Sequence, residues 1–277
     1  MGTLQFTKMH GAGNDFIVFD AADERAIPSA AQLRALAHRH TGIGFDQAMV
    51  LMPARRAGTQ VYYRIFNADG GEVEQCGNGA RAVAELLHRT ARAPSSEIEM
   101  DSPAGPVAAR VVTDGVIAVD MGEPDFAPAA LPFDAPAEAP NYVLDVDGER
   151  VSIGAVSMRN PHAVLTVADV ATAPVARLGA AIERHARFPR RVNVGFMQVL
   201  DDTHIRLRVF ERGVGETQAC GTGACAAVAV GRKAGRLAGD VAVALPGGTL
   251  RIRWEGDGAP VWMSGPAEVA FRGEVEL

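Results

Sequence analysis

The strongest constraint on the fold of this 277-residue chain is an internal repeat. One copy comprises residues 64–66, 71–72 and 76–80, which read Arg-Ile-Phe, Gly-Glu and Cys-Gly-Asn-Gly-Ala. The other comprises residues 208–210, 215–216 and 220–224, which read Arg-Val-Phe, Gly-Glu and Cys-Gly-Thr-Gly-Ala. Every matched residue lies at the same offset from its cysteine, so the alignment needs no gap. This repeat predicts two related half-molecules.

Weaker pairings precede the repeat in each half. Gly13-Asn14 matches Arg159-Asn160, and Gln47 matches Asn193, once the offset is changed by two residues. Between the halves, residues 123–140 contain a proline at every fourth position from Pro124 to Pro140. Proline lacks the amide donor and fixes φ, so this stretch is neither a helix nor a central strand. We expect a connector, with an N-terminal half at 1–122 and a C-terminal half at 123–265.

Each half shows the same order of expected elements. A β-branched strand, a Gly/Glu loop and an Ala-rich helix follow one another. The repeat strands are expected at 60–66 and 203–210, and the repeat helices at 79–91 and 223–237. Further helices are expected at 29–40, with a serine cap, and at 173–188. Other strands are expected at 16–19, 106–112, 116–121, 143–156 (a hairpin turning at 147–148), 193–200, 241–245, 249–254 and 261–264. Many short strands and few helices favour an α+β fold with curved sheets.

Composition excludes several functional classes. The formal net charge of −6 argues against nucleic acid as a partner, since phosphate binding relies on Lys and Arg. The most apolar stretch, residues 224–231, is too short to span a bilayer, and residues 1–20 lack the apolar core of a signal peptide. We therefore expect a cytoplasmic protein with reduced thiols and no membrane partner. Only Lys8 and Lys233 are lysines, so a Schiff-base cofactor has few attachment points.

The three cysteines are neither a disulfide scaffold nor a metal site. Their spacing lacks a zinc-binding pair, and we expect no metal. Cys225 lies inside the second repeat helix among alanines, where packing is its expected role. No Gly-x-Gly-x-x-Gly or Gly-Lys-Ser/Thr phosphate loop is present, which excludes the common nucleotide-binding motifs.

Cys76 and Cys220 fall where a loop enters a helix. The unpaired amides and the positive end of the helix dipole favour a thiolate and should lower the thiol pKa from ~8.5. The same amides can bind a carboxylate. A pair of thiols, one as base and one as acid, suits the inversion of a carbon stereocentre without a cofactor. Glu72 and Glu216 occupy equivalent repeat positions, where they either fix the cysteine loop or contact the substrate.

Eight ordered motifs resemble the diaminopimelate epimerase family. They comprise residues 8–16, 42–47, 66–72, 76–81, 160–162, 192–194, 211–217 and 220–223. The resemblance implies two pseudo-symmetric α/β halves, each a curved, mostly antiparallel sheet around a central helix. It also implies that the last strand, about 266–277, returns to the first half, and that the protein is a homodimer. Phe45 departs from the family pattern, which has a smaller residue there, and could reshape the pocket beside Gln47.

The implied activity is a cofactor-independent epimerase that interconverts LL- and meso-2,6-diaminopimelate, on the route to lysine and peptidoglycan precursors. By resemblance, Cys76 and Cys220 are the catalytic thiols, and His162 and Glu211 modulate them. The substrate, a small diamino diacid, would contact Asn14, Gln47, Asn67, Gly77, Asn78, Asn160, Asn193, Glu211, Arg212, Gly221 and Thr222. The Arg212 guanidinium suits a carboxylate, which it can hold through two parallel hydrogen bonds.

Two other functions fit the residues less fully. A proline or hydroxyproline racemase would use the same thiol pair, but its ring substrate has no distal amino-acid group for Asn67, Asn193 and Arg212. A thiol redox sensor or an amino-acid binding module would need no turnover. Deuterium uptake at the substrate α-carbon in heavy water distinguishes an enzyme from both of these non-catalytic roles.

Overall fold

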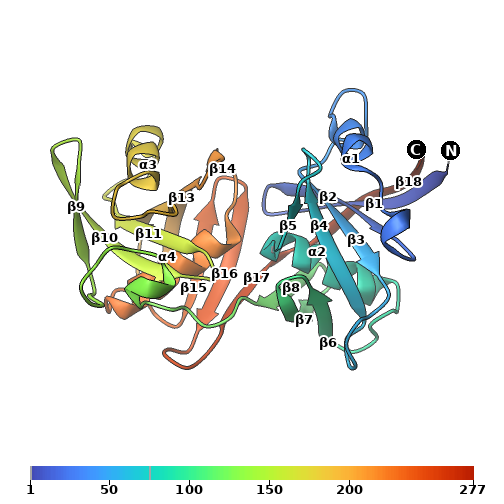
Figure 1. The fold of residues 1–277 in the computed structure, drawn as a ribbon. Coiled ribbons are helices and arrows are strands. Elements are labelled where there is room, and N and C mark those ends of the chain that lie inside the picture. The colour runs from blue at the N-terminus through green and yellow to red at the C-terminus, as the bar shows by residue number, and fades with distance from the viewer. Residues whose placement is uncertain (1, 75) are drawn as a thin grey trace. The chain divides into compact units, whose positions relative to one another are not determined.

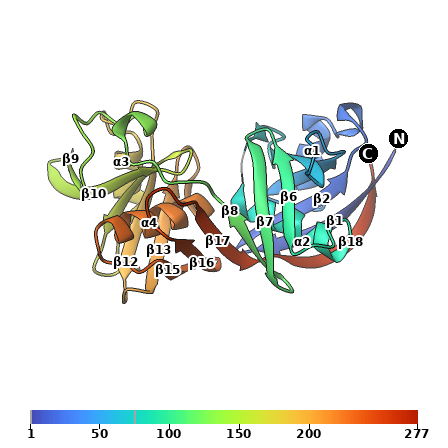
Figure 2. The same cartoon turned by 90° about the horizontal axis from the view of Figure 1, so that it is seen from below.

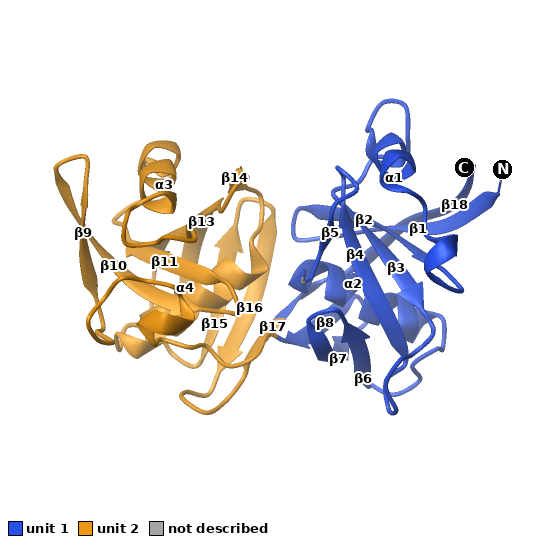
Figure 3. Ribbon diagram, viewed as in Figure 1, with its two compact units in different colours: residues 1–120, 264–277 blue, residues 121–263 orange. Residues whose placement is uncertain are grey.

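The computed structural model describes residues 2–74 and 76–277. The chain forms two compact units, residues 1–120 with 264–277 and residues 121–263 (Figure 3). We call them unit 1 and unit 2, and describe each by itself. Both combine a mixed sheet with few helices, so the α+β fold class is confirmed.

Unit 1 is a curved sheet around one long helix (Figures 1 and 2). Its helices are η1 (Glu24–Ala26), α1 (Ala30–Ala37) and α2 (Gly77–Arg89). Its strands are β1 (Thr3–Gly11), β2 (Asn14–Asp20), β3 (Gln47–Met52), β4 (Val61–Asn67), β5 (Glu72–Val73), β6 (Glu97–Ser102), β7 (Gly105–Thr113), β8 (Val116–Asp120) and β18 (Glu268–Glu276). They pair in the order β18-β1-β2-β3-β4-β6-β7-β8, with parallel pairs only at β2–β3 and β4–β6.

Unit 2 repeats this order. Its helices are η2 (Pro128–Ala130), α3 (Val175–Glu183) and α4 (Gly221–Lys233). Its strands are β9 (Tyr142–Val146), β10 (Glu149–Ser157), β11 (Pro161–Thr166), β12 (Asn193–Val199), β13 (His204–Glu211), β14 (Gly215–Thr217), β15 (Asp240–Leu245) and β16 (Gly248–Trp254). Strand β17 (Val261–Pro266) begins in unit 2 and ends in the segment that belongs to unit 1. The order β9-β10-β11-β12-β13-β15-β16 again has its parallel pairs at the third and fifth junctions, β11–β12 and β13–β15.

The strand register explains the two-residue change of offset seen in the sequence. Gln47 lies opposite Phe16 on β2, and Asn193 lies opposite His162 on β11. The β3–β4 hairpin is two residues longer than the β12–β13 hairpin, as the pairs Ala48–Phe66 and Val194–Phe210 show. Gln47 and Asn193 therefore occupy equivalent places in the two units.

The central helices, α2 and α4, are buried along most of their length. Residues 77–87 of α2 and 223–231 of α4 are buried. In α4 the buried residues 224–229 are all small or apolar, as suits a helix enclosed by strands, whereas α2 also buries the charged residues Arg81 and Glu85. Cys225 is fully buried in α4, in agreement with the packing role expected for it.

The proline-rich connector belongs to unit 2. It forms only a short 3-10 turn, η2, and an isolated bridge between Asp125 and Ser157. Phe133 then inserts into the core of unit 2, where its ring stacks on Phe188 at 4.5 Å between centroids. Within the part of the chain that is described, no helix is long and apolar enough to cross a membrane.

Candidate functional site

Cys76 and Cys220 are the N-cap residues of α2 and α4. Each has extended backbone, and its sulfur accepts a hydrogen bond from the third amide of its helix, Gly79 N at 3.3 Å and Gly223 N at 3.4 Å. A helix supplies no internal partner for its first amides, here those of residues 77–78 and 221–222. Each cysteine thus lies beside N–H groups that suit an anion, as the sequence predicted.

Neighbouring side chains lie close to the third residue of each helix, which is a glycine in both. A Cβ on Gly223 would lie 2.9 Å from Val209 Cγ2 and 3.2 Å from Cys220 Sγ. A Cβ on Gly79 would lie 2.7 Å from Met49 Sδ. The second glycine after each cysteine is therefore closely packed, against Met49 at Gly79 and against Val209 and Cys220 at Gly223.

Two equivalent ion pairs fix the loops that lead to the cysteines. Arg64 on β4 holds Glu72 through two hydrogen bonds of 2.6 Å each, and Arg208 on β13 holds Glu216 through bonds of 2.6 and 2.8 Å. Arg64 lowers the pKa of Glu72 through these hydrogen bonds, although partial burial opposes the effect. The structure thus gives Glu72 and Glu216 the first of their two expected roles, which is to fix the loop.

Glu211 lies against the Cys220 thiol at the end of β13. Its carboxylate accepts a hydrogen bond from Thr217 Oγ1 at 2.5 Å and interacts with the Cys220 side chain. Burial raises the pKa of Glu211, while the hydrogen bonds from Thr217 and Cys220 lower it. Glu211 is thus a carboxylate in contact with a candidate acid/base thiol.

The expectation that the helix end lowers the thiol pKa is wrong for Cys220. Burial raises the pKa of this thiol well above its usual value, and the negative charge of Glu211 raises it further. The hydrogen bonds with Thr222 and the Gly223 amide act in the opposite direction but do not prevail. The free-energy cost of a buried thiolate is larger than the stabilisation that one helix N-terminus provides. Cys220 is therefore a protonated thiol at neutral pH.

His162 is buried at the start of β11 and does not carry a charge at neutral pH. Burial, with a further contribution from Arg212, lowers its pKa to about 3. Its Nε2 lies 2.9 Å from Asn160 Oδ1, and Asn160 Nδ2 lies 3.4 Å from Thr222 Oγ1. Arg159, directly before Asn160, has left-handed backbone with φ of 65°. This row of side chains connects His162 to the N-terminal turn of α4.

Asn193 and Arg212 meet close to His162, since Asn193 lies opposite His162 on the neighbouring strand β12. Asn193 Nδ2 donates to the Pro161 carbonyl at 3.1 Å, and its Oδ1 accepts from the Arg212 amide at 2.9 Å. The Arg212 side chain is exposed, and its Nη1 donates to the Arg190 carbonyl at 3.2 Å. Asn193 thus orients the residue that carries the guanidinium.

The predicted asparagines and glutamine of unit 1 form two hydrogen-bonded pairs. Gln47 Nε2 donates to Asn67 Oδ1 at 2.9 Å across the β3–β4 ladder. Asn78 Nδ2, in the first turn of α2, donates to Asn14 Oδ1 at 2.6 Å. The second pair lies beside the cysteine cap, since residue 78 follows Cys76 by two positions.

Sequence reasoning assigned no role to a charged group next to Asn14. Lys8 and Arg39 both bind Asp15, and Arg39 also binds Asp46. Their signal was present, because three of these four residues lie in motifs that carry the family resemblance. By contrast, Phe45 belongs to the hydrophobic core of unit 1 rather than to a pocket, and only 1% of it is exposed.

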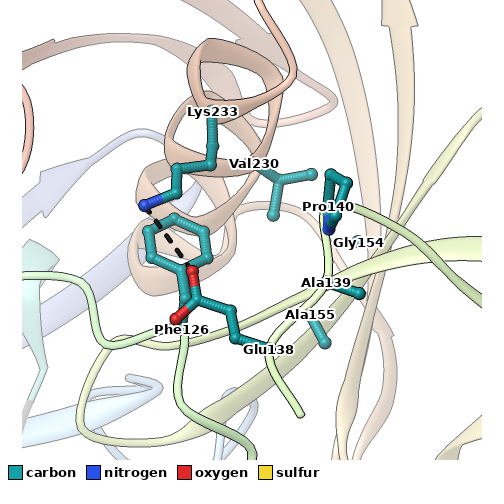
Figure 4. A pocket seen from close by; sticks show the side chains of 8 residues that line it. All are labelled: Phe126, Glu138, Ala139, Pro140, Gly154, Ala155, Val230 and Lys233. Atoms are coloured by element: carbon teal, nitrogen blue, oxygen red, sulfur yellow. Dashed lines mark ion pairs between the residues drawn. The ribbon is translucent and has the colours of Figure 1, made fainter.

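A cavity of about 230 Å³ lies at the far end of α4 from Cys220 (Figure 4). The connector, β10 and the last turn of α4 line it, and Lys233 Nζ lies 3.6 Å from Glu138 at its edge. A helix rises ~1.5 Å per residue, so the thirteen residues of α4 separate this cavity from Cys220. We assign it no part in thiol chemistry.

Comparison with known proteins places this geometry in one family. The family model described as Diaminopimelate epimerase matches residues 6–127 and 154–270. A diaminopimelate epimerase of Alkalilimnicola ehrlichii is 54% identical over 276 residues, covering 99% of each chain. One from Nitrosospira multiformis is 52% identical over 274 residues, again covering 99% of each chain.

Solved structures show the same fold at low identity. A phenazine biosynthesis protein of the PhzF family from Bacillus anthracis superposes with a TM-score of 0.71 at 15% identity, covering 100% of both chains. A probable proline racemase from Agrobacterium radiobacter, with bound carbonate, superposes with a TM-score of 0.69 at 17% identity, covering 99% of this chain and 93% of that one.

Proposed function

Because the chain belongs to the diaminopimelate epimerase family, we propose that it interconverts LL- and meso-diaminopimelate through Cys76 and Cys220. The observation that carries this proposal is the equivalent placement of the two thiols. Each caps a helix whose first amides have no internal partner, and each is preceded by a loop fixed by an Arg–Glu pair. Two related units thus supply one acid/base thiol each.

The proposed chemistry needs one thiolate and one thiol on opposite faces of the same carbon. One sulfur takes the α-proton, and the electron pair left on carbon is stabilised through the substrate carboxylate, which the helix-terminal amides bind. The other sulfur then delivers its proton to the opposite face, and the configuration is inverted. The roles of the thiols exchange in the reverse direction.

The raised pKa of Cys220 assigns it the acid role in one direction. When Cys220 must act as the base, Glu211 is placed to accept the thiol proton, since the two side chains already interact. His162 connects to the N-terminal end of α4 through Asn160 and Thr222. We propose that Glu211 modulates Cys220 directly and that His162 acts as a neutral group.

The substrate contacts follow from the charge of each polar group. Amides of Gly77, Asn78, Gly221 and Thr222 suit the carboxylate at the reacting carbon. The exposed guanidinium of Arg212, oriented through Asn193, suits a second carboxylate. The Gln47–Asn67 pair and the Asn14 and Asn160 amides can both donate and accept, which suits a zwitterionic end.

Replacement of each thiol tests the proposal. Purified, reduced Cys76→Ala and Cys220→Ala variants are incubated with LL-diaminopimelate in heavy water, and stereochemistry and deuterium uptake are followed. We expect the wild type to form the meso isomer with label at one α-carbon, and each variant to lose epimerisation. Cys225→Ala, which removes a buried thiol away from the caps, is the matched control and should retain turnover. Epimerisation by either single variant would contradict the two-thiol mechanism.

The other two functions are not favoured. The racemase likeness is one of fold at 17% identity, whereas relatives above 50% identity are diaminopimelate epimerases. A redox or binding role would predict that wild-type protein with reduced thiols leaves the substrate unlabelled in the same assay. The cytoplasmic location and the homodimer remain predictions. Phe271, half exposed on β18, is an apolar residue that a partner subunit could cover.

A further inference from the structure

Asp46, which contacts Asn14, determines the direction of the hydrogen bonds that run from Asp46 through Asn14 to Asn78. Asp46 accepts donors at both of its oxygens, Arg39 Nη2 at Oδ1 (2.7 Å), and the Asp15 amide (3.2 Å) and Asn14 Nδ2 (3.3 Å) at Oδ2. A carboxylate in an ion pair with arginine can only accept. Asn14 must therefore turn its NH₂ group toward Asp46.

The orientation of Asn14 in turn fixes that of Asn78. With its NH₂ group committed to Asp46, Asn14 faces α2 with its oxygen, which accepts from Asn78 Nδ2 at 2.6 Å. The remaining polar atom, Asn78 Oδ1, is buried and has no hydrogen-bond partner among the residues that the structure describes. Asn78 as a whole is only 4% exposed. A buried acceptor without a donor is costly, so this oxygen points to a ligand group.

In unit 2 the equivalent carboxamide, that of Asn160, is oriented the other way round. Asn160 directs its oxygen toward the neutral His162 and its NH₂ group toward Thr222, the residue that corresponds to Asn78. The hydroxyl of Thr222 can donate as well as accept. Of these two equivalent positions, residue 78 therefore presents an oxygen that can only accept, whereas residue 222 presents a hydroxyl that can also donate.

We infer that Asp46 is a positioning residue which, through Asn14, holds the Asn78 carboxamide oxygen as an acceptor for an amino group of the substrate. This inference rests on the proposed function and deepens it. The carboxylates of a diamino diacid only accept, and its ammonium groups only donate, so an acceptor-only oxygen selects ammonium. Reversal of the two amides would present NH₂ at this place and favour a carboxylate instead.

The test compares Asp46→Asn with Asp15→Asn, which neutralises the neighbouring carboxylate. Asparagine at 46 puts an NH₂ group against existing donors in either orientation, so the Asn14–Asn78 pair loses its fixed direction. We expect kcat/KM of Asp46→Asn to fall about 10- to 100-fold, as for a lost hydrogen bond to a charged group, with a raised KM. The Asp15 carboxylate binds Lys8, Arg39 and the Asp46 backbone amide but not the Asn14 side chain, so Asp15→Asn should lower the thermal midpoint more and KM less.

A double variant keeps the inference falsifiable if Asp46→Asn loses stability. Combining Asn14→Asp with Asp46→Asn exchanges the two side chains, so the carboxamide at position 46 donates to the carboxylate at position 14, although its NH₂ group still faces the Asp15 amide. That carboxylate still accepts from Asn78. We expect this variant to recover at least tenfold in kcat/KM over Asp46→Asn. A fall confined to kcat in Asp46→Asn, or a double variant no better than the single one, would overturn the inference.

A second readout does not depend on turnover. The side-chain amide signals of Asn78 in protein labelled with ¹⁵N-asparagine should shift in Asp46→Asn and return toward the wild type in the double variant. Unchanged Asn78 signals in Asp46→Asn would refute the positioning role, whether or not the wild type acts on diaminopimelate. An inactive wild type with the expected amide shifts would instead refute the proposed function alone.

Discussion

Burial raises the pKa of both the Cys220 thiol and the Glu211 carboxyl, because both side chains are removed from water. The negative charge of Glu211 is the second cause of the raised thiol pKa, after burial. Glu211→Gln removes that charge but retains the shape of the side chain. We therefore expect the pKa of Cys220 to fall in this variant, while epimerisation falls by at least about 100-fold, the usual contribution of a general base.

This prediction is measured by titrating the thiolate absorbance near 240 nm in a Cys76→Ala background, so that Cys220 gives the signal. Cys225 contributes the same in both proteins and cancels in the difference. A thiol pKa that stays the same or rises in Glu211→Gln would show that Glu211 does not act on Cys220 through its charge.

Residues differ in how far sequence alone determines their role. Cys76 and Cys220 could be placed at helix entrances because the repeat and the flanking glycines are local features. The upward shift of the Cys220 pKa could not be predicted from the sequence, because it results from burial, which depends on how strands enclose α4. Asp46 lies in a family motif, but its role depends on which atom of Asn14 it contacts, which the sequence does not show. A sequence motif identifies a site residue, but the direction of its hydrogen bonds is known only from the three-dimensional structure.

At the scale of elements, the two helix caps differ in how much space they leave at the third position. The Cβ of Gly223→Ala would meet Val209, a β-branched side chain on a strand, and the Cys220 sulfur itself. The Cβ of Gly79→Ala would meet mainly the end of Met49, an unbranched side chain that can adopt another rotamer. We expect Gly223→Ala to lose most activity and Gly79→Ala to lose less.

In Gly223→Ala the new Cβ should displace the Cys220 sulfur. Thermal unfolding of both variants distinguishes this local effect from a general loss of folding. Alanine gains about 1 kcal/mol over glycine in helix propensity, which offsets part of the steric cost in both variants. Both should therefore remain folded, with their difference appearing in kcat. Equal activity in the two variants would contradict the steric explanation.

Helix ends and turns could be predicted from the sequence where a few adjacent residues determine them. The serine cap of α1 and the hairpin turn at Asp147-Gly148 are confirmed, and both depend on a few adjacent residues. Strands β1, β3, β6 and β11 were not predicted, and the short strands β5 and β14 formed where a Gly/Glu loop was expected. β3 and β11 are buried on nearly every residue and lack the alternation that identifies a strand. The edge strand β18 has no buried residue, so only the family resemblance indicated its return to unit 1.

At the scale of the whole molecule, acid destabilises the fold through groups whose pKa is lowered by folding. Burial lowers the pKa of His162 from 6.5 to about 3, so between these values the unfolded chain binds a proton that the folded chain does not. Stability therefore falls as the pH decreases through this window. Asp15 acts in a separate window. Burial raises the pKa of Asp15, but its hydrogen bonds and ion pairs with Arg39 and Lys8 together lower it below 3.8, so its contribution is lost only as the pH falls below 3.8.

Denaturant unfolding of the wild type and His162→Gln at pH 7, 6, 5 and 4 isolates the histidine. One proton bound only by the unfolded state gives a slope of about 1.4 kcal/mol for each pH unit. The free energy of unfolding of the wild type should decrease relative to His162→Gln with a slope approaching this value below pH 6. The other six histidines are common to both proteins and cancel. Parallel curves down to pH 4 would mean that His162 takes up its proton in the folded protein, and the neutral role proposed for it would fail.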